Sequence, residues 1–151
     1  MENNNEKARV ALVLSSGGAR GYAHVGAIKA LEERGYRISS VAGASMGALV
    51  GGVYCTGKLD ELTEWFCKLT KREVLSLIDV TQREVVFSKG SIERAIRSSI
   101  SMPSVLKPIE VAHHVLIDGG IVNPLPLNRV PRHAGDILES VNVSAPASAE
   151  M

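Results

Sequence analysis

Hydrophobic positions in the first third of the chain switch between continuous apolar runs and helical spacing. The apolar runs are short enough for buried parallel strands, and apolar residues three to four positions apart mark one face of a helix. In chain order the pattern predicts a strand over Arg9 to Ser15, a helix from Tyr22 that stops at Gly35, a strand over Ile38 to Ala42 and a helix over Ala48 to Tyr54. This strand-helix-strand order predicts a parallel sheet with a right-handed crossover.

The remaining pattern is weaker but extends the same alternation. It predicts an amphipathic helix through Leu59, Leu62, Phe66 and Leu69, a short strand over Val85 to Phe87, a helix with Ser91 as its N-cap, a strand over Val115 to Ile117 and a last strand over Asp136 to Val143. We therefore expect a compact α/β fold of three layers, with a mainly parallel central sheet flanked by helices. One domain spans residues 8–143, and residues 1–7 and 144–151 are flexible tails.

Composition narrows the classes of function. With 151 residues, 45% hydrophobic and 22% charged, the chain has the balance of a globular domain. A net charge of +1 provides no basic stripe, which argues against nucleic acid as a partner. No apolar stretch reaches the about 18 residues of a membrane span, and the start MENNNEKAR lacks a secretory signal, so we expect a cytoplasmic protein. No carboxylate cluster has ligand spacing, so calcium is not implied. We expect no metal and no cofactor.

Gly43-Ala44-Ser45-Met46-Gly47 stands at the junction between a predicted strand and a predicted helix. A nucleophilic serine is presented on such a sharp turn, and glycines two positions before and after it leave room for neighbouring backbone. Ser45 would begin a helix, where the dipole and free N–H groups favour developing negative charge. Taken alone, the motif also fits a glycine-rich turn that merely packs a helix on a strand.

Ser16 to Gly21 forms a glycine-rich loop directly after the first strand. Backbone N–H groups of such a loop can converge on a phosphate or on an oxyanion. The loop is not a dinucleotide fingerprint, because Ser16 replaces its first glycine and no acidic residue follows the second strand. It is not a P-loop either, since no Gly-Lys-Ser/Thr follows the glycines.

Asp118-Gly119-Gly120 follows the apolar triplet Val115 to Ile117. An aspartate at the carboxyl end of a parallel strand points into the crevice where α/β sheets place their sites. By itself an Asp-Gly-Gly is most often only a turn. The motif gains meaning because a nucleophilic serine needs a base.

Together these segments resemble the patatin-like phospholipase family from about Val10 to Leu127. The resemblance rests on four segments in the same order: SSGGARGYAHVGAIKALEERG, VAGASMGALVGG, RSSISMPSVLKPI and VLIDGGIVNPLPLN. It implies that Ser45 is the nucleophile and Asp118 its proton acceptor. It also implies that Gly17 and Gly18 donate oxyanion-hole N–H groups, that Arg20 supports this loop, and that Gly43 and Gly47 shape the elbow.

The activity implied by the resemblance is hydrolysis of lipid carboxylic esters, as in a phospholipase, lysophospholipase or esterase, without a cofactor. Such a substrate implies transient, peripheral contact with a membrane surface. Met102, Val105 and Leu106 fit either that contact or the core. A Ser–Asp dyad needs no histidine, and we expect His24 to be structural.

The segment between the elbow and the Asp-Gly-Gly motif is short. Ser45 and Asp118 are 73 positions apart, a spacing considerably below that of the family the chain resembles. Either the chain is a compact member with a smaller acyl pocket, or it keeps the site residues without a working cavity. The second alternative predicts a catalytically weak or inactive domain that serves as a binding or assembly module.

Overall fold

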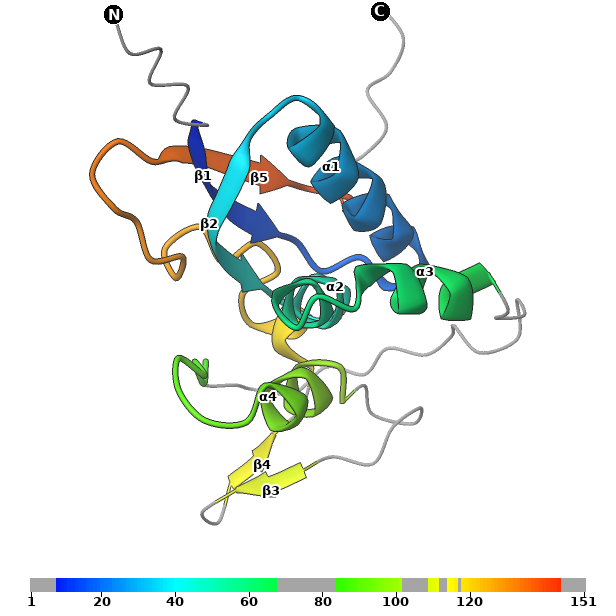
Figure 1. Ribbon diagram of the computed structural model, residues 1–151. Coiled ribbons are helices and arrows are strands. Elements are labelled where there is room, and N and C mark those ends of the chain that lie inside the picture. The colour runs from blue at the N-terminus through cyan, green and yellow to red at the C-terminus, as the bar shows by residue number, and fades with distance from the viewer. Residues whose placement is uncertain (1–7, 68–83, 102–108, 112–113, 117, 145–151) are drawn as a thin grey trace, which may run out of the picture.

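The structure is a computed structural model that describes residues 8–67, 84–101, 109–111, 114–116 and 118–144. Strands and helices follow one another closely up to Cys67, and the elements described after it are shorter (Figure 1). The elements are β1 (Arg9–Leu14), the 3₁₀ turn η1 (Gly18–Gly21), α1 (Tyr22–Glu33), β2 (Arg37–Gly43), α2 (Met46–Cys55), α3 (Leu59–Cys67), α4 (Ile92–Ser99), β3 (Ile109–Val111), β4 (His114–Leu116), the 3₁₀ turn η3 (Gly119–Ile121) and β5 (Ile137–Val141).

The main sheet has three parallel strands in the order β2-β1-β5. β1 is its centre and pairs with β2 from Arg9 to Leu14 and with β5 from Val10 to Leu14. All five residues from Val10 to Leu14 are completely buried, as expected for the central strand of a parallel sheet. Each of these three strands was predicted from the sequence, and their bounds agree to within two residues.

The two faces of β1 contribute to different hydrophobic clusters. Val10, Leu12 and Leu14 face a large cluster with apolar residues of α1, α2 and α3, and these helices cover that face of the sheet (Figure 1). Ala11 and Val13 face a smaller cluster that includes Val130 and Leu125, from the turns between η3 and β5. The expected α/β fold, with a parallel sheet flanked by helices, is confirmed.

Helix α4 packs on α2 rather than on the sheet (Figure 1). Gly52 permits this approach, because a Cβ at that position would lie 2.5 Å from Cδ1 of Ile96. The predicted N-cap of α4 is confirmed, since the Ser91 hydroxyl accepts a hydrogen bond from the Arg94 N–H at 3.2 Å. The end of α4 is thereby placed close to the start of α2.

Two predicted strands are corrected by the structure. The triplet Val85 to Phe87 is irregular backbone with exposed side chains, because no described strand lies beside it to share hydrogen bonds. The strand expected over Val115 to Ile117 is β4, which pairs antiparallel with β3 in a separate two-stranded sheet; Ile117 is outside the described residues. β4 pairs with the segment nearest to it in sequence, so Asp118 does not follow a strand of the parallel sheet.

Two other expectations fall on residues that the structure does not describe. They are the terminal tails, apart from Ser144, and the apolar residues Met102, Val105 and Leu106. Among the described residues, no helix combines the length and the apolar character that crossing a bilayer requires.

Candidate active site

Ser45 lies at a sharp turn between β2 and α2. Its φ of 50° is the single positive value among the described non-glycine residues, so this backbone is strained. A Cβ at Gly43 would overlap the carbonyl of Gly47, and one at Gly47 would overlap the carbonyl of Leu14 and lie 2.6 Å from that of Ser15. The two glycines therefore let the elbow fold tightly against the end of β1.

The side chain of Ser45 is directed to Asp118. The Ser45 hydroxyl donates a hydrogen bond of 2.6 Å to Oδ2 of Asp118, and these residues are only 7% and 4% exposed. Ser45 is the N-cap of α2, yet its hydroxyl caps none of the free helix N–H groups, as an N-cap serine usually does. The hydroxyl is hydrogen-bonded to the carboxylate instead, so the structure brings together the two residues that the sequence analysis paired.

Asp118 begins the turn η3, and the backbone on both sides holds it in place. Its Oδ1 accepts the N–H of Gly120 at 2.7 Å, and its own N–H donates to the carbonyl of Ser101 at 3.1 Å. Burial raises the pKa of the Asp118 carboxyl above its usual value, although the hydrogen bonds from Ser45 and Gly120 act in the opposite direction. Hydrogen bonds thus fix the orientation of the carboxylate, and burial increases its proton affinity.

The glycine-rich loop flanks this pair. Its Ser16 N–H donates to the carbonyl of Pro124 at 2.7 Å, and a Cβ at Gly120 would lie 2.5 Å from that of Ser16. At the other end of the loop, a Cβ at Gly21 would overlap the side chain of Met46, the neighbour of Ser45. The loop is therefore in contact with both the elbow and the Asp-Gly-Gly turn.

Within this loop, the N–H groups of Gly17 and Gly18 make no hydrogen bond to another described residue. Gly18 has a φ of 51°, which a glycine adopts without strain. The N–H groups of Gly17 and Gly18 therefore have no acceptor among the described residues, and their role in an oxyanion hole stays a prediction. The side chain of Arg20 is exposed and has no hydrogen bond or ion pair with the described part of the chain; its N–H donates to the carbonyl of Gly17 at 3.0 Å.

His24 and His133 have partners other than Ser45 and Asp118. His24 is fully buried, and its Nε2 lies 2.8 Å from the carbonyl of Ser15; because a carbonyl only accepts, this nitrogen carries the hydrogen. Desolvation lowers the pKa of His24, which keeps the ring neutral. The Nδ1 of His133 lies 3.3 Å from Oδ2 of Asp136. His24 therefore has the structural role expected from the sequence.

The structure adds Ser99 and Ser101, two residues for which the sequence suggested no role. The Ser99 hydroxyl accepts the backbone N–H of Ser45 at 2.9 Å, and the Ser101 carbonyl accepts the N–H of Asp118. Both lie in the segment RSSIS, which the family resemblance had already singled out. The family resemblance was the signal in the sequence that could have pointed to Ser99 and Ser101. Periodicity could not, because the contact between Ser45 and Ser99 joins residues 54 positions apart.

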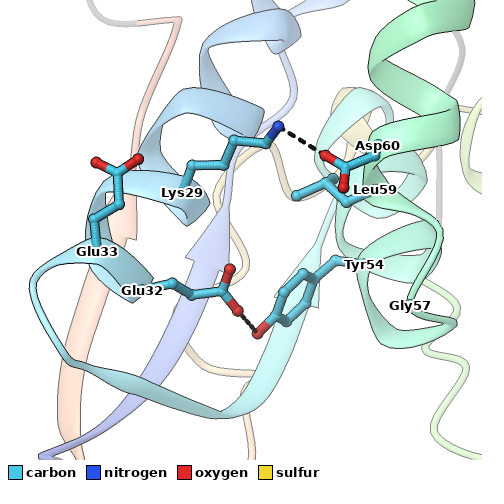
Figure 2. Close-up of a pocket in the computed structure, with 7 residues that line it drawn as sticks. All are labelled: Lys29, Glu32, Glu33, Tyr54, Gly57, Leu59 and Asp60. Atoms are coloured by element: carbon cyan, nitrogen blue, oxygen red, sulfur yellow. Dashed lines mark hydrogen bonds and ion pairs between the residues drawn. The ribbon is translucent and has the colours of Figure 1, made fainter.

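A surface hollow of about 440 Å³ lies away from this site, between α1, the end of α2 and the start of α3 (Figure 2). Lys29 bonds Asp60 across it at 2.8 Å, and the Tyr54 hydroxyl donates to Glu32 at 2.8 Å. Burial, with this hydrogen bond, raises the pKa of Tyr54 to about 12. None of the predicted site residues lines the hollow, and no group of three or more potential metal ligands occurs among the described residues.

A serine on a sharp, strained strand-to-helix turn is the way in which α/β hydrolases present a nucleophile, and here the serine is hydrogen-bonded to a buried carboxylate. The family model of patatin-like phospholipases matches residues 12–86, which include the glycine-rich loop and the elbow. The chain belongs to the patatin-like phospholipase family.

Similar curated proteins support the same assignment. Uncharacterized NTE family proteins of Mycobacterium tuberculosis and Mycobacterium bovis are each 38% identical over 177 residues, covering 90% of this chain and 49% of the relative. The neuropathy target esterase sws of Drosophila persimilis is 32% identical over 165 residues, covering 78% of this chain and 11% of the esterase. The chain therefore spans about half the length of the mycobacterial relatives and a small part of the insect esterase.

Proposed function

We propose that this chain is a serine acyl hydrolase that cleaves carboxylic ester bonds of lipids through a Ser45–Asp118 dyad. The observation that carries the proposal is the buried 2.6 Å hydrogen bond from the Ser45 hydroxyl to the Asp118 carboxylate. Membership of the patatin-like phospholipase family and similarity to proteins named as esterases support hydrolysis of an ester.

In the proposed reaction, Oγ of Ser45 attacks the ester carbonyl while Oδ2 of Asp118 accepts the hydroxyl proton. The N–H groups of Gly17 and Gly18 donate to the oxyanion of the tetrahedral intermediate. Collapse of the intermediate breaks the bond to the leaving alcohol, which takes the proton from Asp118. Water then attacks the acyl-enzyme with Asp118 as base, releasing the acid and restoring Ser45.

The electrostatics of the carboxylate support its role as base. A carboxylate is a weak acceptor for a serine hydroxyl, and burial that raises the pKa of Asp118 increases its proton affinity. The Gly120 N–H occupies Oδ1, which leaves Oδ2 directed at the hydroxyl. The base is thus oriented without the histidine of a three-residue triad.

A fluorophosphonate probe tests the proposal, because it phosphonylates an activated serine whatever the natural substrate is. We expect the wild-type protein to be labelled and to hydrolyse a short p-nitrophenyl ester, and Ser45→Ala to do neither. Ser98→Ala is the matched control, since that buried hydroxyl bonds the Arg94 carbonyl within α4. Labelling that survives Ser45→Ala would remove Ser45 from the mechanism.

A second candidate is a binding or assembly module with little or no activity. The observation that favours it is the alignment with the mycobacterial relatives, whose 177 residues exceed the 151 of the whole chain. The relatives thus carry residues without a counterpart here. Wild-type protein that folds cooperatively yet is neither labelled nor active on the ester would select this candidate.

A further inference from the structure

The backbone N–H of Ser45 is bonded to a side chain from a distant segment. It donates to the hydroxyl oxygen of Ser99, at the end of α4, over 2.9 Å. The first N–H groups of a helix have no partner inside that helix, and Ser45 is the N-cap of α2. Ser99 thus supplies an acceptor that the elbow itself lacks.

This bond acts on the strained backbone of the elbow. At a φ of 50° and a ψ of −120°, Ser45 is outside the regions that non-glycine residues favour, so surrounding contacts must hold it there. Holding its N–H restrains the plane of the preceding peptide, and this plane together with the φ of 50° sets the direction of the Cα–Cβ bond. The 2.6 Å distance from its hydroxyl to Asp118 depends on that direction.

The same end of α4 also contacts the other half of the dyad. A Cβ at Gly119 would lie 2.8 Å from the Ser99 hydroxyl and 4.0 Å from the Ser45 nitrogen, so Ser99 lies between the elbow and the Asp-Gly-Gly turn. Two residues further on, the Ser101 carbonyl accepts the N–H of Asp118 at 3.1 Å. Nucleophile and base are therefore held by neighbouring residues of one segment.

We infer that Ser99 is a positioning residue of the active site, which holds Ser45 in its reactive conformation through the backbone N–H. The inference rests on the proposed function and deepens it, because it assigns the alignment of the dyad to the end of α4. Ser99 acts through Ser45 and takes no proton, so it should affect the rate of acylation and leave the pKa of the base unchanged.

The test compares Ser99→Ala and Ser99→Thr with wild type and with Ser98→Ala. Ser98 is the adjacent residue of α4, is 3% exposed and donates its hydroxyl to the Arg94 carbonyl of the same helix, so its substitution reports the cost of losing a serine hydroxyl from α4. Thermal unfolding, the rate of fluorophosphonate labelling, kcat and KM on a p-nitrophenyl ester, and the pH dependence of labelling are measured for each folded variant.

We expect Ser99→Ala to label about tenfold more slowly, the effect of one lost hydrogen bond to a buried N–H, with lower kcat and little change in KM. The acid limb of its pH profile should match that of wild type, and Ser99→Thr, which retains the hydroxyl, should recover most of the rate. An equal loss in Ser98→Ala, or labelling of Ser99→Ala at the wild-type rate, would overturn the inference alone. Wild-type protein that is not labelled would overturn the proposed function, and this inference with it.

Discussion

Replacing Asp118 with asparagine removes the proposed base with little change in shape. The side chain is 4% exposed, and its Oδ1 accepts the Gly120 N–H at 2.7 Å. An amide oxygen can accept the same bond, so the turn η3 should remain. At the position of Oδ2, which faces Ser45, the amide cannot take the hydroxyl proton, because an amide is far less basic than a carboxylate.

The expected loss follows from the role of a positioned base. General-base catalysis contributes about 10²- to 10⁴-fold, so Asp118→Asn should slow acylation by that factor, or about 3 to 5 kcal/mol of transition-state free energy. The free energy of unfolding of Asp118→Asn should be equal to or higher than that of wild type. The pKa of Asp118 is raised in the folded state, so the ionised carboxylate disfavours folding near neutral pH, and a neutral amide removes this cost.

Single-turnover fluorophosphonate labelling measures the acylation step without a contribution from deacylation, and thermal unfolding at the same pH measures stability. Asn123→Asp is a useful comparison, because it exchanges the same two side chains at a position that bonds Glu84 and Asn128 rather than Ser45. Asp118→Asn protein that unfolds like wild type and labels at a near-normal rate would refute the assignment of Asp118 as the base.

Three further predictions follow from the geometry. The rate of fluorophosphonate labelling should rise as the pH passes the raised pKa of Asp118, because the ionised carboxylate is the base. A rate that stays constant from about pH 4 to about pH 8, the usual range of carboxyl and histidine groups, would contradict this. Gly47→Ala should lower the unfolding free energy by about 1–3 kcal/mol, because the added Cβ meets the rigid carbonyls at the end of β1. Gly26→Ala, with open space around it in α1, should raise the unfolding free energy by about 0.5–1 kcal/mol. Equal melting temperatures for the two variants would argue against the close approach at Gly47. His24→Ala should leave the Ser15 carbonyl without its donor and lower the unfolding free energy, measured by chemical denaturation, by about 1–3 kcal/mol. The folded fraction should still react with the fluorophosphonate probe. Loss of labelling in fully folded protein would indicate a catalytic histidine.

The elements that the sequence predicted well are those whose signal is local. β1, α1, β2 and α2 follow one another with apolar runs, helical spacing and glycines at their boundaries, and the bounds of each agree closely with the structure. The elbow belongs to the same group, because its strain and its two glycines act within five consecutive residues. Family resemblance supplied Asp118, and the structure brings its carboxylate to Ser45.

The features that sequence reasoning missed depend on contacts between distant segments. A strand exists only if another strand pairs with it, so an apolar triplet such as Val85 to Phe87 is not sufficient, and the partner of β4 could not be read from the residues of β4. Ser99 is likewise an ordinary helical serine until α4 packs on α2. Pairing and packing of this kind are set by the whole fold rather than by local periodicity.

The anchoring of the glycine-rich loop has a consequence for biosynthesis. Ser15 bonds Val141 and Val143 through its backbone and its hydroxyl, and the Ser16 carbonyl accepts the hydroxyl of Ser144. A ribosome that has added Gly120 has therefore made the proposed nucleophile, the proposed base and the proposed oxyanion donors, but none of these three anchoring residues at and just after the end of β5. Because closing so long a loop is slow and domains fold as units, the nascent chain should acquire a reactive serine only after β5 has emerged and paired with β1.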